Sequence, residues 1–177
     1  MRRIIPAAAI VTTSILGAAI AASTVMAAPA AAANHKAKPK PKSFNSCSVV
    51  TQAEAASAIG ASLTKGVLGN ATVEGGLACV FYGSSAPTPQ TPNVAQPDTV
   101  RVVVVKGSNA LKWYKDYKSK VHARPITGYG DKAYYDGYAS LSVLKGNFYL
   151  RIAVSPAKAP PSLSDEEHLA TAILAKL

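Results

Sequence analysis

The chain has 177 residues, of which 49% are apolar, and it carries 19 Lys and Arg against 9 Asp and Glu. Of the formal charge of +10, two units fall in residues 1–33 and four in residues 34–42, so residues 43–177 hold 13 basic and 9 acidic side chains, a net charge of +4. This length fits one small domain, and so modest a charge without a reader motif excludes a typical nucleic-acid-binding protein. We therefore expect no nucleic-acid partner.

The N-terminal segment has the pattern of a secretory signal peptide. Arg2 and Arg3 form a short positive region, an apolar stretch runs to Ala22, and small residues continue to Ala33. Val25-Met26-Ala27 fits the small-x-small cleavage rule, which predicts a signal peptide over 1–27 and a secreted protein. An uncleaved membrane anchor is the alternative, but the stretch is mostly alanine, with few large aliphatic residues.

Residues 28–45 are rich in Ala, Lys and Pro, which predicts a disordered linker. Like charges repel one another and proline favours an extended chain. We expect this basic arm either to contact an anionic surface, such as cell-wall polymer or lipid headgroups, or to serve only as a spacer. The lysines concerned are Lys36, Lys38, Lys40 and Lys42.

Cys47 and Cys79 are the only two cysteines, and in an exported chain they are expected to form a disulfide. Their separation of 32 positions corresponds to a chain-entropy contribution of roughly 3.5 to 4 kcal/mol. Neither cysteine has a neighbouring histidine and there is no Cys-x-x-Cys motif, so we expect a structural pair, with no metal and no redox role.

A single domain is predicted over residues 46–177, and it opens with a helix. Thr51-Gln52-Ala53-Glu54 is a capping box and Gly60 is a stop signal, which together predict a helix over 51–59. Gly75-Gly76 then separates two strand-like segments and predicts the turn of a hairpin. These strands are predicted at 71–74 and 77–82, and a third, apolar on both faces, at 100–105.

The segment 84–98 contains four prolines, at positions 87, 89, 92 and 97, a spacing that neither a helix nor a strand tolerates. The sequence therefore predicts a long loop. It is either a tolerated insertion, since lengthening a surface loop costs little, or a functional segment that inserts into another protein as an interaction or inhibitory module.

The second half of the domain again alternates predicted helices and strands. Ser108 can cap a helix that runs to about residue 121, and Ser164-Asp165-Glu166-Glu167 is a second capping box before an apolar stripe that ends at Leu177. Three more strands are predicted, at 132–136, 139–144 and 148–154. The order α-β-β-β-α-β-β-β-α favours an α+β fold, an antiparallel sheet with helices packed on one face.

The helix that begins near Ser108 offers a possible anionic-ligand face. Lysines recur along it, and two aromatic rings could add stacking to charge. The alternative is an ordinary amphipathic helix with a charged outer face and an aromatic inner face. The residues of this face are Lys112, Lys115, Lys118, Trp113 and Tyr117.

The sequence predicts no catalytic residue, no metal and no cofactor. There is no Gly-x-Ser-x-Gly elbow, no His-Glu-x-x-His motif and no phosphate-binding glycine loop. His168 lies beside two acids at the start of the last predicted helix, where it is expected to face solvent. The alternative is a secreted hydrolase that uses His122 together with acids that folding brings near it.

Gly128-Tyr129-Gly130-Asp131-Lys132-Ala133-Tyr134 is the most distinctive segment. Gly128, Gly130 and Asp131 predict a structural turn before a strand, with a ligand-binding loop as the alternative.

With this motif, the segment Cys47–Gly60, the strand opened by Cys79 and the turn Lys145-Gly146-Asn147, residues 46–177 resemble a family of exported, often lipid-anchored, actinobacterial domains of unknown function. The chain departs from that family in lacking a lipobox and in the 84–98 loop, which looks like an insertion. The resemblance implies the fold and export, but no activity. We therefore expect a secreted, non-enzymatic, monomeric domain that binds a ligand or partner at the cell envelope.

Overall fold

The structure is a computed structural model that describes residues 43–177. The predicted signal peptide over 1–27, nearly all of the predicted linker over 28–45 and the four lysines of the basic arm lie outside the described residues. None of the helices in residues 43–177 combines the length and the apolar composition that crossing a membrane requires.

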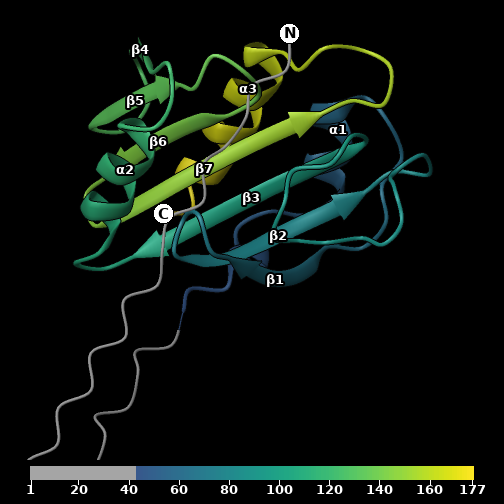
Figure 1. The fold of residues 1–177 in the computed structure, drawn as a ribbon, viewed down its shortest axis with the longest axis horizontal. Coiled ribbons are helices and arrows are strands. Elements are labelled where there is room, and N and C mark those ends of the chain that lie inside the picture. The colour runs from purple at the N-terminus through teal and green to yellow at the C-terminus, as the bar shows by residue number, and fades with distance from the viewer. Residues whose placement is uncertain (1–42) are drawn as a thin grey trace, which may run out of the picture. The chain divides into compact units, whose positions relative to one another are not determined.

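One antiparallel sheet of seven strands forms the centre of the domain, in the order β1-β2-β3-β7-β6-β5-β4 (Figure 1). The strands are β1 (Val67–Ala71), β2 (Gly76–Tyr82), β3 (Thr99–Lys106), β4 (Arg124–Ile126), β5 (Lys132–Tyr135), β6 (Leu141–Lys145) and β7 (Phe148–Ser155). The helices are a 3-10 turn η1 (Ser46–Ser48), α1 (Gln52–Ile59), α2 (Ala110–Lys118) and α3 (Leu163–Leu174). The predicted α+β class and the alternation of helices and strands are confirmed.

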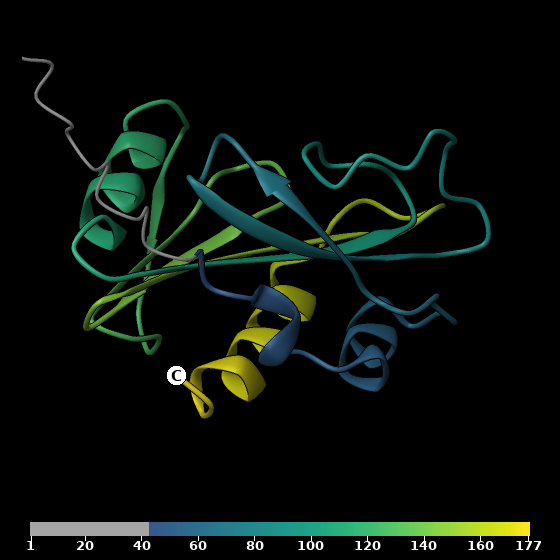
Figure 2. The ribbon, with the colours of Figure 1, turned by 90° about the horizontal axis from the view of Figure 1, so that it is seen from below.

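Helices cover both faces of the sheet (Figure 2). The residues of β3 alternate in direction: Val102 and Val104 pack with α1 and α3, whereas Val103 and Val105 pack with α2 on the other side. The sequence predicted all helices on one face, and α2 departs from that expectation. The physical reason is the valine run of β3, because a strand that is apolar on both sides needs cover on both sides.

The prediction of the first hairpin was wrong in position: β1 spans Val67–Ala71 instead of 71–74, the turn covers 72–75, and Gly76 already belongs to β2, because the strand pairs with β2 ahead of the turn that was taken for it.

The sequence did not predict β4 at all. This strand has three residues, pairs only with β5, and contains Pro125, which cannot donate a ladder hydrogen bond. Proline is tolerated there because β4 is an edge strand. The helix predicted over 108–121 is also shorter in the structure: α2 begins after Asn109, whose side chain makes no capping bond.

The first predicted capping box is present and the second is not. Glu54 N donates to Thr51 Oγ1 over 3.2 Å, and Thr51 N donates to Glu54 Oε2 over 2.8 Å. The last helix begins earlier in the sequence than its predicted capping residue, Ser164. There α3 starts at Leu163 behind Ser162, and Ser164 is already inside the helix.

The predicted disulfide between Cys47 and Cys79 is confirmed, with their Cα atoms 4.9 Å apart. It joins β2 to η1, which lies below the sheet in Figure 2. The preceding residue reinforces this attachment: the Ser46 hydroxyl accepts a hydrogen bond from Val104 N over 2.8 Å and donates one to Leu77 O. Leu77 and Val104 face each other across β2 and β3, so η1 is attached to both strands.

The proline-rich loop over 84–98 forms no helix or strand, as predicted, and it folds back against the sheet. Arg101 Nε donates to Pro92 O over 3.0 Å, and Thr72 N donates to Asn93 Oδ1 over 2.8 Å. Pro92 sits directly over Gly69, where an added Cβ would lie 2.6 Å from the proline ring. The loop therefore packs on its own domain, on the same face of the sheet as α2.

Candidate functional site

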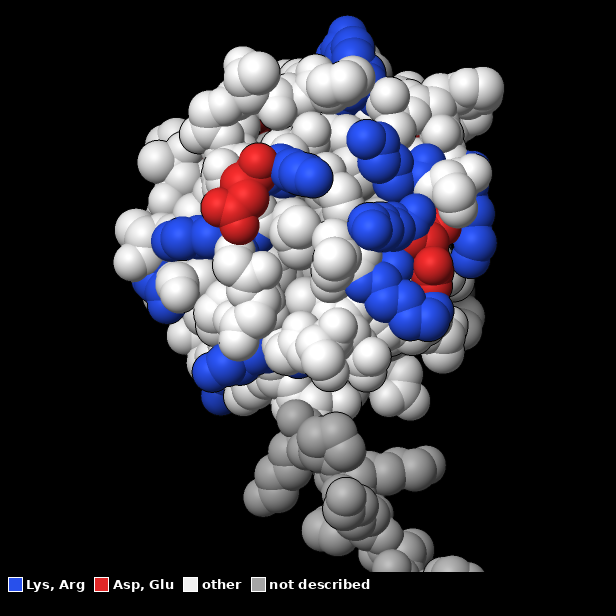
Figure 3. All heavy atoms as spheres, turned by 90° about the vertical axis from the view of Figure 1, so that its left-hand side faces the viewer, with Lys and Arg blue, Asp and Glu red and all other residues white. Residues whose placement is uncertain are grey.

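Positive charge is concentrated at one end of the domain. Residues 106–132 carry seven Lys and Arg against two Asp, a net +5, whereas the other described residues carry six Lys and Arg against seven Asp and Glu. Figure 3 looks at this end and shows several groups of basic side chains, and fewer acidic ones, among uncharged residues. We call it the basic end; its residues, all exposed, are Lys106, Lys112, Lys115, Lys118, Lys120, Arg124 and Lys132.

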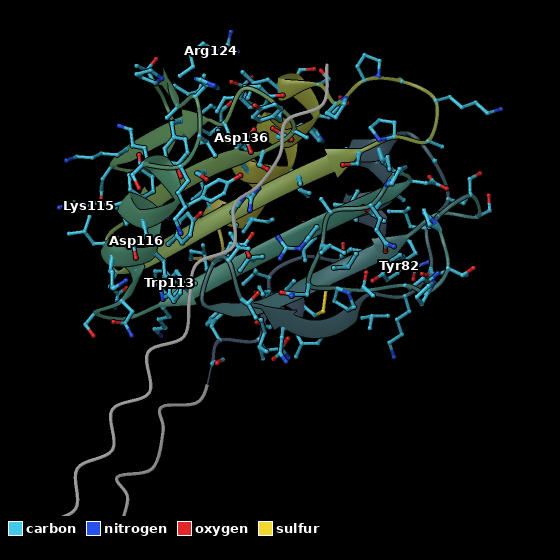
Figure 4. The ribbon with its side chains drawn as sticks, viewed as in Figure 1. Tyr82, Trp113, Lys115, Asp116, Arg124 and Asp136 are labelled. Atoms are coloured by element: carbon cyan, nitrogen blue, oxygen red, sulfur yellow. A yellow bond between two sulfur atoms is a disulfide. The ribbon has the colours of Figure 1, made fainter. Side chains whose placement is uncertain are left out.

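The basic end is built around α2, which is held to the sheet by aromatic packing. Tyr114 lies on the inner side of the helix, with its ring centroid 5.0 Å from that of Tyr134 and 5.9 Å from that of Tyr149, both in edge-on geometry. With this side buried, the lysines of α2 are directed to solvent, and Figure 4 shows Lys115 pointing away from the ribbon. Lys115 and Lys118 also lie in the last turn, where cations stabilise the helix dipole.

Four of the cations rest on aromatic rings. Such contacts stabilise an exposed cation by about 0.5 to 1 kcal/mol and restrict where its side chain can point. These contacts therefore hold four of the seven cations of the basic end in restricted positions. The distances from cation to ring centroid are 5.2 Å for Lys106 over Phe148, 5.1 Å for Lys112 over Trp113, 5.8 Å for Lys118 over Tyr134 and 5.5 Å for Arg124 over Tyr135.

The two acids of this segment offset little of the charge. Asp116 pairs with Lys112, one turn earlier on α2. Asp131 is engaged in the turn before β5, where its carboxylate accepts a hydrogen bond from Gly146 N over 2.6 Å. Within residues 43–177, Lys115, Lys120 and Lys132 form no ion pair, so their charges remain available to an anion.

The two aromatic residues predicted for the anionic-ligand face are less accessible than the lysines. Trp113 is half-buried beside Gly75, where an added Cβ would lie 1.9 Å from the indole. Tyr117 turns inward: its ring lies 3.8 Å from the Arg151 guanidinium, and its hydroxyl donates to Asp136 Oδ2 over 2.8 Å. The structure thus brings the lysines of the predicted face to the surface without Tyr117.

Sequence reasoning missed a buried ion network on the α2 face of the sheet. Arg101 and Arg151 project from neighbouring strands, and the Glu74 carboxylate accepts hydrogen bonds from both guanidinium groups. Arg151 also donates to Tyr117, Ser140 and Asp136. The signal that could have found it is a basic residue at position 101 within a strand that is otherwise valine.

The charges of this network are balanced internally. Burial by itself raises the pKa of Glu74, but hydrogen bonds and charge from Arg101 and Arg151 outweigh burial and hold the pKa below its ordinary value. The pKa of Asp136 is likewise lowered, because hydrogen bonds from Tyr138, Ser140 and Tyr117 outweigh its burial. Two carboxylates therefore face two guanidinium groups, and the network joins α2, the β1–β2 turn and the sheet without surplus charge for a ligand.

The Gly128, Gly130 and Asp131 segment forms a structural turn. Asp131 N donates to Leu144 O over 2.7 Å, and at Gly130, with φ +54°, an added Cβ would lie 2.5 Å from the same carbonyl oxygen. A surface hollow of about 310 Å³ lies between this turn and the end of α3. Because Lys145 Nζ donates across it to Leu174 O over 2.7 Å, the nearest cation is already engaged.

The two histidines in the described part of the chain, His122 and His168, lie apart from each other on the surface. His122 is exposed, and its imidazole makes no hydrogen bond with any described residue. His168 is exposed as well, at the rim of a hollow of about 280 Å³ between α1 and α3. No three His, Cys, Asp or Glu side chains in residues 43–177 are grouped as metal ligands.

Comparison with known proteins identified no relative of this chain. No family model matches the chain, and neither a curated protein nor a solved structure matches it. The basic end is therefore the candidate site on the evidence of charge and geometry.

Proposed function

We propose that this protein is exported and that its domain binds an anionic polymer of the cell envelope through the basic end, without catalysing a reaction. The observation that carries this proposal is the separation of charge: a net +5 on residues 106–132 and a net −1 on the remaining described residues. A single-sign patch of this kind attracts polyanions and accelerates their association.

Export is supported by two independent features. The first 27 residues have the order of a secretory signal peptide. The Cys47–Cys79 disulfide is typical of proteins that fold in oxidising compartments. The resemblance of this chain to exported actinobacterial domains is part of the same proposal.

A polymer suits the basic end better than a bilayer does. Proteins that bind membranes through a helix bury an apolar face below the headgroups. Leu111 is the only large exposed apolar side chain within the segment of the basic end, whereas exposed cations of that segment lie on α2, on the strand ends and on β4. A linear chain of anionic groups can follow these cations around the end of the domain, whereas a flat surface reaches only some of them.

The lysines of the N-terminal arm are proposed to strengthen this binding. Ser43, the first described residue, lines a hollow of about 120 Å³ together with Lys106 and Asn109, so the chain enters the domain beside the basic end. Four lysines precede Ser43 within seven residues. Each lysine near an anionic surface contributes up to about 1 kcal/mol at low salt.

The test is binding of the purified chain to inorganic polyphosphate, compared with a Lys115→Gln/Lys120→Gln variant. Both side chains are exposed and make no ion pair in the described domain, so the fold is retained while two charges are lost. We expect about tenfold weaker binding at low salt, with the difference shrinking as salt screens the charges. Isothermal titration calorimetry measures both.

The matched control is Lys65→Gln/Lys158→Gln, which removes two exposed charges outside the basic end. If both double variants lose affinity equally, net charge alone controls binding and the proposed site is wrong. Vesicles containing phosphatidylglycerol provide the second comparison. Tighter binding to these vesicles than to polyphosphate, at equal phosphate concentration, would replace the polymer by a membrane surface.

A further inference from the structure

In place of the monomer expected from the sequence, we propose that two copies of this chain pair through the outer edge of β1. This strand ends one side of the sheet, and Figure 1 shows no strand beyond it. Apart from the turn bond from Gly75 N to Ala71 O, the backbone of Val67–Ala71 hydrogen-bonds only to β2 among the described residues. An unpaired strand edge is a template for pairing with another extended chain.

The two edges of the sheet are built differently. At the opposite edge, β4 has only three residues, one of them Pro125 without an N–H group and another the charged Arg124, and each of these features blocks edge pairing. At β1, by contrast, residues 66–73 contain neither proline nor a charged side chain. The protection that natural sheets place on an exposed edge is thus present on one side and missing on the other.

Apolar side chains accompany the open edge. Val67 is 44% exposed and Leu68 is 41% exposed, and alternation along the strand puts them on opposite faces of the sheet. Val73 and Val94, which also belong to the large exposed apolar residues, lie on the adjoining turn and loop. A strand added to β1 would therefore bury apolar surface on both sides of the new ladder.

The positive charge of the basic end favours an antiparallel arrangement of the two β1 strands over a parallel one. Because β2 runs antiparallel to both neighbours, β1 points the same way as β3, which ends at Lys106 in the basic end. Parallel pairing of two copies would bring their basic ends side by side. Antiparallel pairing sends them to opposite ends of the joined sheet and requires only one self-complementary edge, as in other two-fold dimers.

The product of this pairing is one continuous sheet with a basic end at either extremity. Its formation does not depend on the proposed polymer binding, because the β1 edge and the cations are separate surfaces. If both proposals hold, the dimer is bivalent toward a long polyanion, and the second contact benefits from a high effective concentration.

The test is sedimentation equilibrium of the purified chain from micromolar to millimolar concentration. We expect a reversible monomer–dimer equilibrium that Leu68→Lys weakens at least about tenfold, because two like charges meet across the two-fold axis. Leu111→Lys is the matched control: it makes the same change at a side chain of similar exposure, 44% against 41%, but on α2. The control is expected to dimerise like the unchanged chain.

Hydrogen exchange gives a second readout and shows whether the variants are folded. Amides of Val67–Ala71 should gain protection as the concentration rises in the unchanged chain and not in Leu68→Lys, while the core amides of β3 stay protected in both. A chain that remains monomeric at millimolar concentration overturns the proposal. So does a dimer that Leu68→Lys leaves intact, or a β1 edge that becomes protected only when an unrelated extended peptide is added.

Discussion

Glu166 places a carboxyl group in the layer between α3 and the sheet, whereas the sequence assigned it only to a capping box at the start of that helix. Its side chain is fully buried; Oε1 accepts a hydrogen bond from Val154 N over 3.4 Å, and Oε2 has no partner among the described residues. Burial raises its pKa to about 9. The group is therefore protonated at neutral pH.

The stability of the domain should fall as the pH rises from about 5 to 9, because of Glu166. In the folded chain the carboxyl keeps its proton through this range, whereas in the unfolded chain it ionises near its ordinary pKa of 4.5. The unfolded state then binds fewer protons, which costs up to about 1.4 kcal/mol of unfolding free energy per pH unit. Urea denaturation at several pH values measures this slope.

Glu166→Gln should remove most of that slope, because the amide does not ionise. Glu167→Gln is the control at the next position, which is only partly buried, and it should keep the slope of the unchanged chain. If all three proteins show the same dependence on pH, Glu166 ionises normally and its burial in the fold is wrong.

At the scale of elements, the 84–98 loop is fastened to the sheet rather than held out for a partner. Asn93→Ala removes the acceptor of the Thr72 amide, and we expect this amide to exchange faster by about tenfold, a loss of about one hydrogen bond. Residue-resolved hydrogen exchange measures the rate. Gln90→Ala, at an exposed position of the same loop, serves as the control and should leave Thr72 unchanged.

An unaltered Thr72 rate in Asn93→Ala would mean that the loop is not docked there. The idea of a loop that inserts into another protein would then regain support. A faster rate confined to Thr72 and its neighbours would show that the docking is local, since Arg101 still holds the loop through Pro92 O.

Elements with strong local signals were predictable, and those that depend on contacts between distant residues were not. The capping box of Thr51 and Glu54 predicts α1, and the alternation of apolar and polar residues from Phe148 to Val154 predicts β7. β4 gave no such signal, because a three-residue edge with a proline acquires its strand geometry only by pairing with β5. The placement of α2 on the second face likewise follows from tertiary packing.

The candidate site likewise has a part that could be predicted from the sequence and a part that could not. Lysines 112, 115 and 118 were predictable from one helix, and the structure adds Lys106, Arg124 and Lys132 from the strand ends and edge that surround it. The ion network around Glu74 was not predictable, because it joins residues as far as 77 positions apart. Such a set becomes visible only when β3 and β7 are known to be neighbours.

At the scale of the whole molecule, the disulfide is the main covalent constraint on the described domain. Cys47→Ser/Cys79→Ser should lower the free energy of unfolding by about 2 to 4 kcal/mol, because the unfolded chain regains the freedom of the closed loop. Urea denaturation measures the difference. Adding a reductant should shift the unchanged chain by a similar amount and the double variant not at all.

A shift of the double variant in reductant would point to an effect unrelated to the bridge. Intact mass after alkylation without reductant provides the direct check on the unchanged chain. Two modified cysteines would contradict the Cys47–Cys79 bond.

The attachment of η1 to the sheet also decides how the domain responds to tension. A pulling force applied through the residues before Ser43 reaches Cys47 after four residues, and there it passes through a covalent bond into β2. The neighbouring Ser46 shares the load between β2 and β3. The opposite terminus has no covalent fastening: Lys176 lies two residues beyond the end of α3, and its ammonium group bonds to Glu54 and to Val49 O. A domain held at the envelope by its N-terminal arm would resist unravelling from the held end and yield first at its C-terminal helix.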